Sequence, residues 1–296
     1  MNFQYSTLFN APLSLATYTL LACAILSLWI KRDYAVWATL FVVATICGII
    51  SNRLQWPALL FMMLFAGLCY FTFHARHLKL KITCGIFVYI MSILLWYHQI
   101  PGFANWQIVN DTLLSADALP FSMYLNFDKP LVGLLILGFG TLPLLKSKKD
   151  GYSVFIKTVP IAIIGTFVIA GLAYAFGYIK FEPKWDNFFI VWFTSNLFLT
   201  VIAEEVLFRG FVQKYLSLAF AKIWFGSGLA LLIASILFAV VHTGGLTYIF
   251  LAFVSGILYG WVYIKTNRIE ASILTHLFLN SVHILLLTYP GQASIT

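Results

Sequence analysis

Two acidic residues and one basic residue interrupt a long apolar stretch of the chain. Glu204, Glu205 and Arg209 lie within 188–216, whereas the other eight acidic residues lie in polar segments or near the ends of apolar runs. Ionisable groups are costly inside a membrane and usually face a protein interior or a water-filled cavity. The spacing of Glu205 and Arg209 favours an ion pair on one helical face. Glu204 would point about 100° away, so it is the carboxylate left for chemistry, unless the cluster only locks helices together.

Two further apolar runs carry polar side chains at helical spacing. Phe238 and His242 share one face of a predicted helix, and His276 and Asn280 share a face of the last one. Taken singly, His242 could mark a helix end, and the other pair could hydrogen-bond between helices. Together with Glu204, they predict one site inside the membrane. A carboxylate and a neutral histidine can deprotonate a water, while a second histidine and an amide can stabilise an oxyanion, so the chemistry predicted is hydrolysis.

The three motifs resemble those of the CAAX-protease and bacteriocin-processing family, also called the CPBP or Abi family. Its marks are EExxxR, FxxxH and HxxxN or HxxxD, each on a membrane helix. They occur here in that order at 204–209, 238–242 and 276–280. The resemblance covers about 188–289.

This resemblance implies a glutamate-type intramembrane endopeptidase that needs no cofactor and no metal ion. Glu204 and His242 would activate the water, and His276 and Asn280 would form the oxyanion site. Eukaryotic members cut prenylated C-terminal CaaX tails, and bacterial relatives are linked to peptide maturation, bacteriocin immunity and processing of membrane proteins. We therefore expect a membrane-anchored or hydrophobic peptide as substrate. Three residues would support the site by organising the helix or by packing: Glu205, Arg209 and Phe238.

The composition fits a membrane protein and excludes a soluble enzyme, a disordered chain and a disulfide scaffold. Of the 296 residues, 61% are hydrophobic and only 9% are charged, against about 25% charged residues in soluble domains. The net charge of +8 is better explained by cytoplasmic loops than by nucleic-acid binding. The four cysteines lie in or beside apolar runs, so we expect neither a disulfide nor a zinc knuckle.

Apolar runs of the length of a membrane span predict an all-α, polytopic bundle of about ten transmembrane helices. Of the seventeen cations in loops and flanks, thirteen lie on one side of this arrangement and four on the other. This asymmetry predicts that both termini are non-cytoplasmic, and we expect the bacterial inner membrane as the location. The runs are 12–30, 34–50, 55–73, 82–98, 131–145, 155–178, 190–215, 226–242, 246–264 and 271–289.

The chain divides by these motifs into two predicted parts. Residues 188–296 would form the catalytic helical core, and 1–187 would add helices for docking or regulation. The long segment 99–130 is mixed polar and aromatic, and we expect it on the non-cytoplasmic face with a surface helix. Gly256 and Gly260 form a GxxxG motif, for which close packing inside the bundle is expected rather than dimerisation.

Three other interpretations of the polar residues stay open. Glu204, His242 and His276 could bind zinc in a metalloprotease, although the HExxH motif is absent. A serine protease would need an activated serine, and the Gly-Ser-Gly string at 226–228 is better explained as a helix cap or turn. A transporter or a non-catalytic immunity scaffold would also use intramembrane acids, but clear inverted repeats are absent. A scaffold would tolerate Glu204→Gln, whereas a hydrolase would not.

Overall fold

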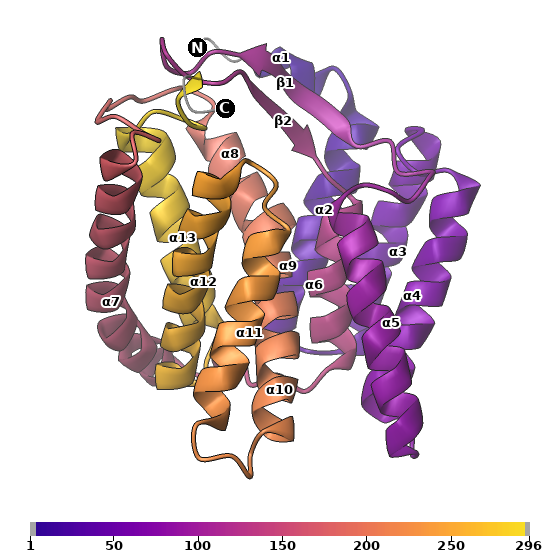
Figure 1. Cartoon of the computed structure of the whole chain (residues 1–296). Coiled ribbons are helices and arrows are strands. Elements are labelled where there is room, and N and C mark those ends of the chain that lie inside the picture. The colour runs from indigo at the N-terminus through magenta and orange to yellow at the C-terminus, as the bar shows by residue number, and fades with distance from the viewer. Residues whose placement is uncertain (1–3, 294–296) are drawn as a thin grey trace.

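A computed structural model describes residues 4–293 as a bundle of helices with one small sheet across its end (Figure 1). The first helices are α1 (Ser6–Phe9), α2 (Pro12–Ile30), α3 (Tyr34–Ile50), α4 (Trp56–His74), α5 (Leu78–Trp96), α6 (Asp128–Phe139) and α7 (Lys148–Ala175). A continuous helix follows, made of α8 (Phe189–Ser195), η1 (Asn196–Val201), α9 (Ile202–Glu205), η2 (Val206–Gln213) and α10 (Lys214–Ala219). The last three are α11 (Gly226–Val240), α12 (Leu246–Thr266) and α13 (Ile269–Leu286).

Every apolar run predicted as a span contains a helix, but the helices differ in length. Within residues 4–293, seven are long and apolar enough to cross a membrane. The apolar helices α3 and α11 have 17 and 15 residues, and α6 has 12. A 12-residue helix is about 18 Å long, well short of the roughly 30 Å of a hydrocarbon core. The predicted count of about ten spans is therefore not confirmed.

The segment 99–130 corrects the all-α prediction, because it holds a β-hairpin where a surface helix was expected. Strands β1 (Trp106–Thr112) and β2 (Phe121–Leu125) pair antiparallel, with Trp106 opposite Leu125 and Thr112 opposite Phe121. Buried residues alternate with more exposed ones along β2, the period of a strand with one face on a core, whereas β1 interrupts this alternation at Ile108 and Val109, where the pairing register shifts. The polar and aromatic composition of this segment therefore encodes a sheet that covers the bundle end.

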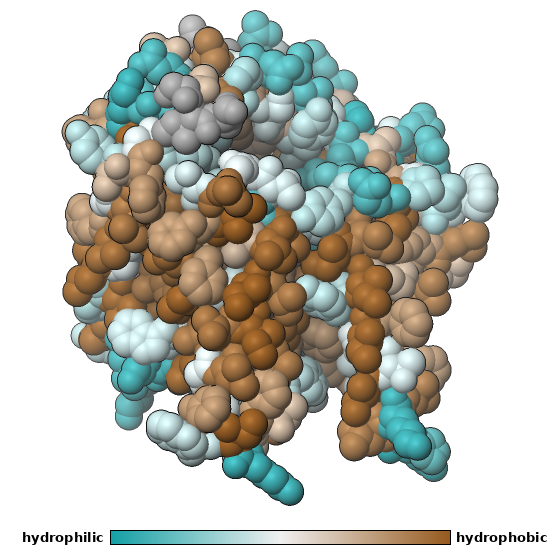
Figure 2. All heavy atoms as spheres, viewed as in Figure 1, coloured by the Kyte–Doolittle hydropathy of each residue, from teal (hydrophilic) through white to brown (hydrophobic). Residues whose placement is uncertain are grey.

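The surface of the bundle has the polarity expected of a protein in a bilayer. On the face shown in Figure 2, a broad apolar zone covers the helices, with hydrophilic residues gathered at the two ends. Exposed apolar residues of the helices include Leu64 on α4, Phe167 on α7 and Ile236 on α11. Outward-facing apolar side chains of this kind are stable against lipid tails rather than water.

Helix α6 lies near the centre of the bundle (Figure 1) and joins its two predicted parts. Ten of its twelve residues are buried, as expected for a helix that is apolar on all sides. It packs against α2, α4 and α5 and also against η1, α9 and η2. Helix α7 packs against α12 and α13. Thus 128–175 covers the C-terminal helices directly, although it precedes residue 188.

The GxxxG motif of α12 packs inside the bundle, as predicted. A Cβ atom at Gly256 would lie 3.2 Å from the Cα of Ser235 on α11. At Gly260 it would lie 2.3 Å from Leu231 Cδ1 and 2.5 Å from Gln213 Oε1. The two glycines therefore allow α12 to approach both α11 and the helix that carries the acidic pair.

Replacing Gly260 with leucine should destabilise the fold by about 1–3 kcal/mol, because the added side chain overpacks a filled interface. The measurement is the thermal unfolding midpoint of the purified protein in detergent. Gly171→Leu on α7 is the matched control, because a Cβ there meets nothing within 4 Å. Equal midpoints for the two variants would contradict the packing argument.

Candidate active site

The helix that carries the acidic pair departs from regular α geometry on both sides of that pair. Ile202–Glu205 is α-helical, but Asn196–Val201 before it and Val206–Gln213 after it are π-helical. The π turns are wider than α turns, are rare, and often occur at functional sites. The sequence prediction assumed a regular α-helix, so the structure corrects it here.

Glu205 and Arg209 form the predicted ion pair in the interior. Arg209 Nη1 lies 3.2 Å from Glu205 Oε1, and both residues are 0% exposed. Arg209 Nη2 also donates to the carbonyl of Gly256 at 3.0 Å. The guanidinium lies 4.4 Å from the ring centre of Phe238 and 5.3 Å from that of Tyr259. The arginine therefore binds one carboxylate, one carbonyl and two aromatic faces on three helices.

His276 connects the two glutamates. Its Nδ1 hydrogen-bonds with Glu205 Oε1 at 2.7 Å, and its Nε2 lies 3.8 Å from Glu204 Oε2. Tyr259 stacks on the imidazole, with ring centres 4.4 Å apart. Since the carboxylate of Glu205 accepts, Nδ1 carries a proton and Nε2 is the nitrogen available toward Glu204. The sequence prediction gave Glu205 and His276 separate tasks, whereas in the structure they are bonded partners.

His242 follows the end of α11 with its two ring nitrogens in different surroundings. Nδ1 lies 2.6 Å from the carbonyl oxygen of Phe238. A carbonyl can only accept, so Nδ1 is the donor, and Nε2 of the neutral ring keeps its lone pair. The ring packs on Phe238 at 4.5 Å, on Trp96 at 5.6 Å and on Tyr248 at 5.7 Å between ring centres. Phe238 thus packs beside His242, as the sequence predicted.

Asn280 has a partner that the sequence analysis missed. Its Nδ2 donates to Asn196 Oδ1 at 3.2 Å. Asn196, Thr200 and Glu204 follow one another at four-residue spacing, and all three line the same cavity. This polar spacing is visible in the sequence and would have identified Asn196 and Thr200 as neighbours of the site.

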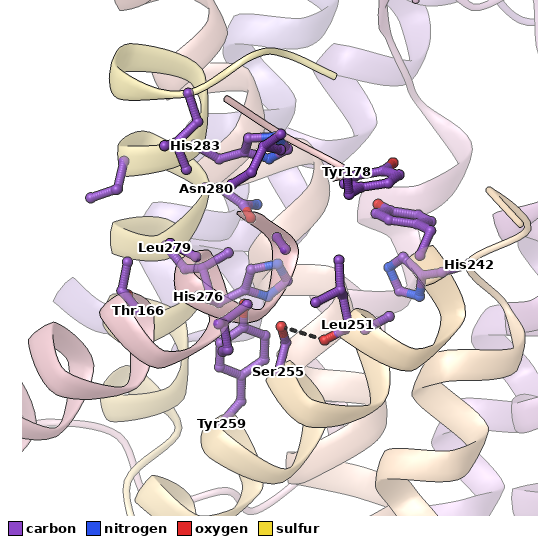
Figure 3. Close-up of a pocket in the computed structure, with 18 of the residues that line it drawn as sticks. Thr166, Tyr178, His242, Leu251, Ser255, Tyr259, His276, Leu279, Asn280 and His283 are labelled. Carbon is purple, nitrogen blue, oxygen red and sulfur yellow. Dashed lines mark hydrogen bonds between the residues drawn. The ribbon is translucent and has the colours of Figure 1, made fainter. Parts of the chain in front are cut away.

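The four residues predicted to be catalytic line one cavity of about 720 Å³. Glu204 and Asn280 approach it from different helices, as do His242 and His276, and Glu204 is 4% exposed. A smaller apolar pocket adjoins it between α7, α12 and α13 (Figure 3). Residues common to the linings of both spaces are Tyr178, His242, Tyr248, His276, Asn280 and His283.

The N-terminal part of the chain also contributes to this site. Trp96, at the end of α5, contacts both His242 and Phe208. Lys129 on α6 places its Nζ 4.6 Å from the centre of the Trp96 ring. Neither residue belongs to a motif, so the sequence gave no signal for them.

The zinc alternative is not supported by the arrangement of side chains. Across residues 4–293, no group of three or more His, Cys, Asp or Glu side chains is close enough to hold a metal ion. Glu204, His242 and His276 share a cavity but are not gathered around one point as metal ligands.

Replacing Arg209 with methionine should destabilise the protein by about 3–5 kcal/mol, because it leaves a buried carboxylate without its cationic partner. The added change Glu205→Gln removes that charge, so the double variant should be less destabilised than the sum of the single variants. Unfolding midpoints of the four proteins in detergent measure this coupling. Strictly additive effects would show that the pair is not coupled.

The family resemblance is confirmed for the part of the chain that carries the motifs. Residues 185–282 match the family model described as type II CAAX prenyl endopeptidase Rce1-like. Searches of the curated proteins and of the solved structures gave no match. The matched family is a protease family, and together with the seven apolar helices it indicates an integral membrane protein. Residues 185–282, which build most of this cavity, are therefore similar to the Rce1-like family of type II CAAX prenyl endopeptidases.

Proposed function

We propose that this protein is a glutamate-type intramembrane endopeptidase that hydrolyses a peptide bond of a membrane-anchored or hydrophobic peptide. The observation that carries the proposal is the convergence of Glu204, His242, His276 and Asn280 on one cavity inside the helical bundle. A cavity lined by a carboxylate, two imidazoles and an amide contains the groups that peptide hydrolysis requires.

The first step is activation of a water by Glu204 and His242. His242 Nδ1 donates to Phe238, so Nε2 is free to accept a hydrogen bond from the water. The carboxylate of Glu204 accepts from the same water and takes its proton. The water oxygen then adds to the carbonyl carbon of the peptide bond and forms a tetrahedral intermediate.

The negative oxygen of this intermediate requires donors, and the last helix supplies them. Asn280 uses one N–H for Asn196, and its second N–H can bind the oxyanion. His276 Nδ1 donates to Glu205, so His276 donates to the oxyanion through Nε2 when its ring is doubly protonated, as an imidazolium. Transfer of the proton from Glu204 to the amide nitrogen then lets the C–N bond break, giving an amine and a carboxylic acid whose remaining proton is then lost to the amine.

The same proposal places the protein in the bacterial inner membrane, with both termini on the non-cytoplasmic side. The cation asymmetry supports this orientation. The bilayer and a peptide substrate are the expected partners, and no nucleic acid is expected.

Glu204→Gln should reduce cleavage by at least about 100-fold, because a positioned general base contributes roughly 10²–10⁴ in rate. The measurement compares membrane peptidomes of cells that make wild-type or variant protein at equal abundance. Precursors should accumulate and products should disappear with the variant. Asp117→Asn is the matched control, since it also converts an acid to an amide but at a position whose side chain is 70% exposed. Identical peptidomes, with a partner bound equally by wild type and variant, would instead support a scaffold.

Cleavage should persist after treatment with 1,10-phenanthroline, because the proposed chemistry uses no metal. The assay follows a substrate identified by the peptidome comparison, using purified protein in detergent before and after chelation. Loss of cleavage that zinc restores would favour the metalloprotease alternative.

A further inference from the structure

The lining of the cavity that contains Glu204 includes exposed loop residues at one end of the bundle, and these form its mouth. Its rim includes Thr243, Gly244 and Gly245, which are exposed and connect α11 to α12. The rim also includes Leu119, from the turn of the β-hairpin, and Pro290, which follows α13. These segments are tied together, because the amide of Leu119 donates to the carbonyl of Gly291 at 2.9 Å. The mouth therefore lies at the end of the bundle that carries the hairpin.

The charges of the molecule distinguish this end from the other. Beside the mouth, loops and helix ends carry four cations, Arg53, Lys129, Lys180 and Lys184. The opposite end carries the remaining thirteen loop and flank cations, in the α2–α3, α4–α5, α6–α7, α10–α11 and α12–α13 connections and their flanks. Loops rich in lysine and arginine stay in the cytoplasm. The mouth is thus on the non-cytoplasmic side.

The apolar pocket beside the cavity indicates what the substrate presents there. It is lined by apolar residues such as Ile169 on α7, Leu251 on α12 and Leu279 on α13, and it reaches His276 and Asn280 (Figure 3). Its volume is about 100 Å³. A cavity of about 150 Å³ accommodates benzene, so this smaller pocket is limited to one apolar side chain of smaller size than a benzene ring.

We infer that the substrate is a membrane-anchored protein cut at the non-cytoplasmic end of its anchor, with one apolar side chain of the anchor in the pocket. The polar residues beyond the cut then leave through the mouth at Thr243–Gly245. This inference deepens the proposed function and rests on it for the cleavage step. The side from which the cavity is reached does not depend on catalysis and is tested separately.

The first test determines which side of the membrane the mouth faces. Thr243→Cys places a thiol at the mouth, and Lys222→Cys places one in the α10–α11 turn, where Lys222 is exposed. A membrane-impermeant maleimide is applied to right-side-out and to inverted membrane vesicles. Thr243→Cys should be labelled in right-side-out vesicles and lose its labelling in inverted ones, with the reverse for Lys222→Cys. The unsubstituted protein, with its four cysteines, gives the background.

A third variant tests whether water reaches the cavity from the same side. Thr200→Cys lies in the cavity wall, and a charged methanethiosulfonate should modify it only in right-side-out vesicles. Labelling of Thr243→Cys or Thr200→Cys only from the cytoplasmic side would overturn the inference. Equal labelling of Thr243→Cys and Lys222→Cys from one side would overturn it as well.

The second test locates the cuts. Peptide termini that are present with wild-type protein and absent with Glu204→Gln should map to the non-cytoplasmic ends of membrane anchors, next to an apolar residue. Termini at cytoplasmic ends would overturn the inference while leaving proteolysis established. Labelling from the non-cytoplasmic side, together with no cleavage that depends on Glu204, would show that the proposed function fails. The inference that the cavity opens on the non-cytoplasmic side would still hold.

Discussion

A buried arginine and its carboxylate partner determine how the C-terminal helices come together. Arg209 and Glu205 are both removed from solvent, and an unpaired charge there would be costly. Both residues also bond to other helices: Arg209 Nη2 donates to the carbonyl of Gly256 on α12, and the Glu205 oxygen that binds Arg209 also accepts from His276 on α13. Gly256 permits this approach because a side chain there would meet α11. One ion pair therefore sets the positions of three helices around the cavity.

The two adjacent glutamates have different surroundings for the same reason. Glu205 is turned toward Arg209 and His276 and has no exposed surface. Glu204 instead lines the cavity and lies 3.8 Å from the second nitrogen of His276. Because His276 is held by the first glutamate, it presents a fixed nitrogen beside the second. A carboxylate supported in this way can exchange protons with water without a rearrangement of the helices.

Local spacing was sufficient for much of this protein. The apolar runs located the helices, since burial in lipid or in the bundle requires continuous apolar segments. Four-residue spacing predicted the ion pair of Glu205 with Arg209 and a shared helical face for Phe238 and His242. The glycine spacing at 256 and 260 likewise predicted close helix packing. Each of these features depends on residues within one or two helical turns.

Other features depend on contacts between residues far apart in the chain, and only the tertiary structure decided them. Glu205 meets His276 across 71 positions, and Asn196 meets Asn280 across 84. No helical period constrains such pairs, so their partners could not be assigned from spacing. The hairpin in 99–130 and the π turns were missed because the bundle end and the neighbouring helices stabilise them. The sequence alone thus determined which residues are candidates for the site, because their types and local spacing are visible in it, and the fold decided how these residues are bonded and where their cavity opens.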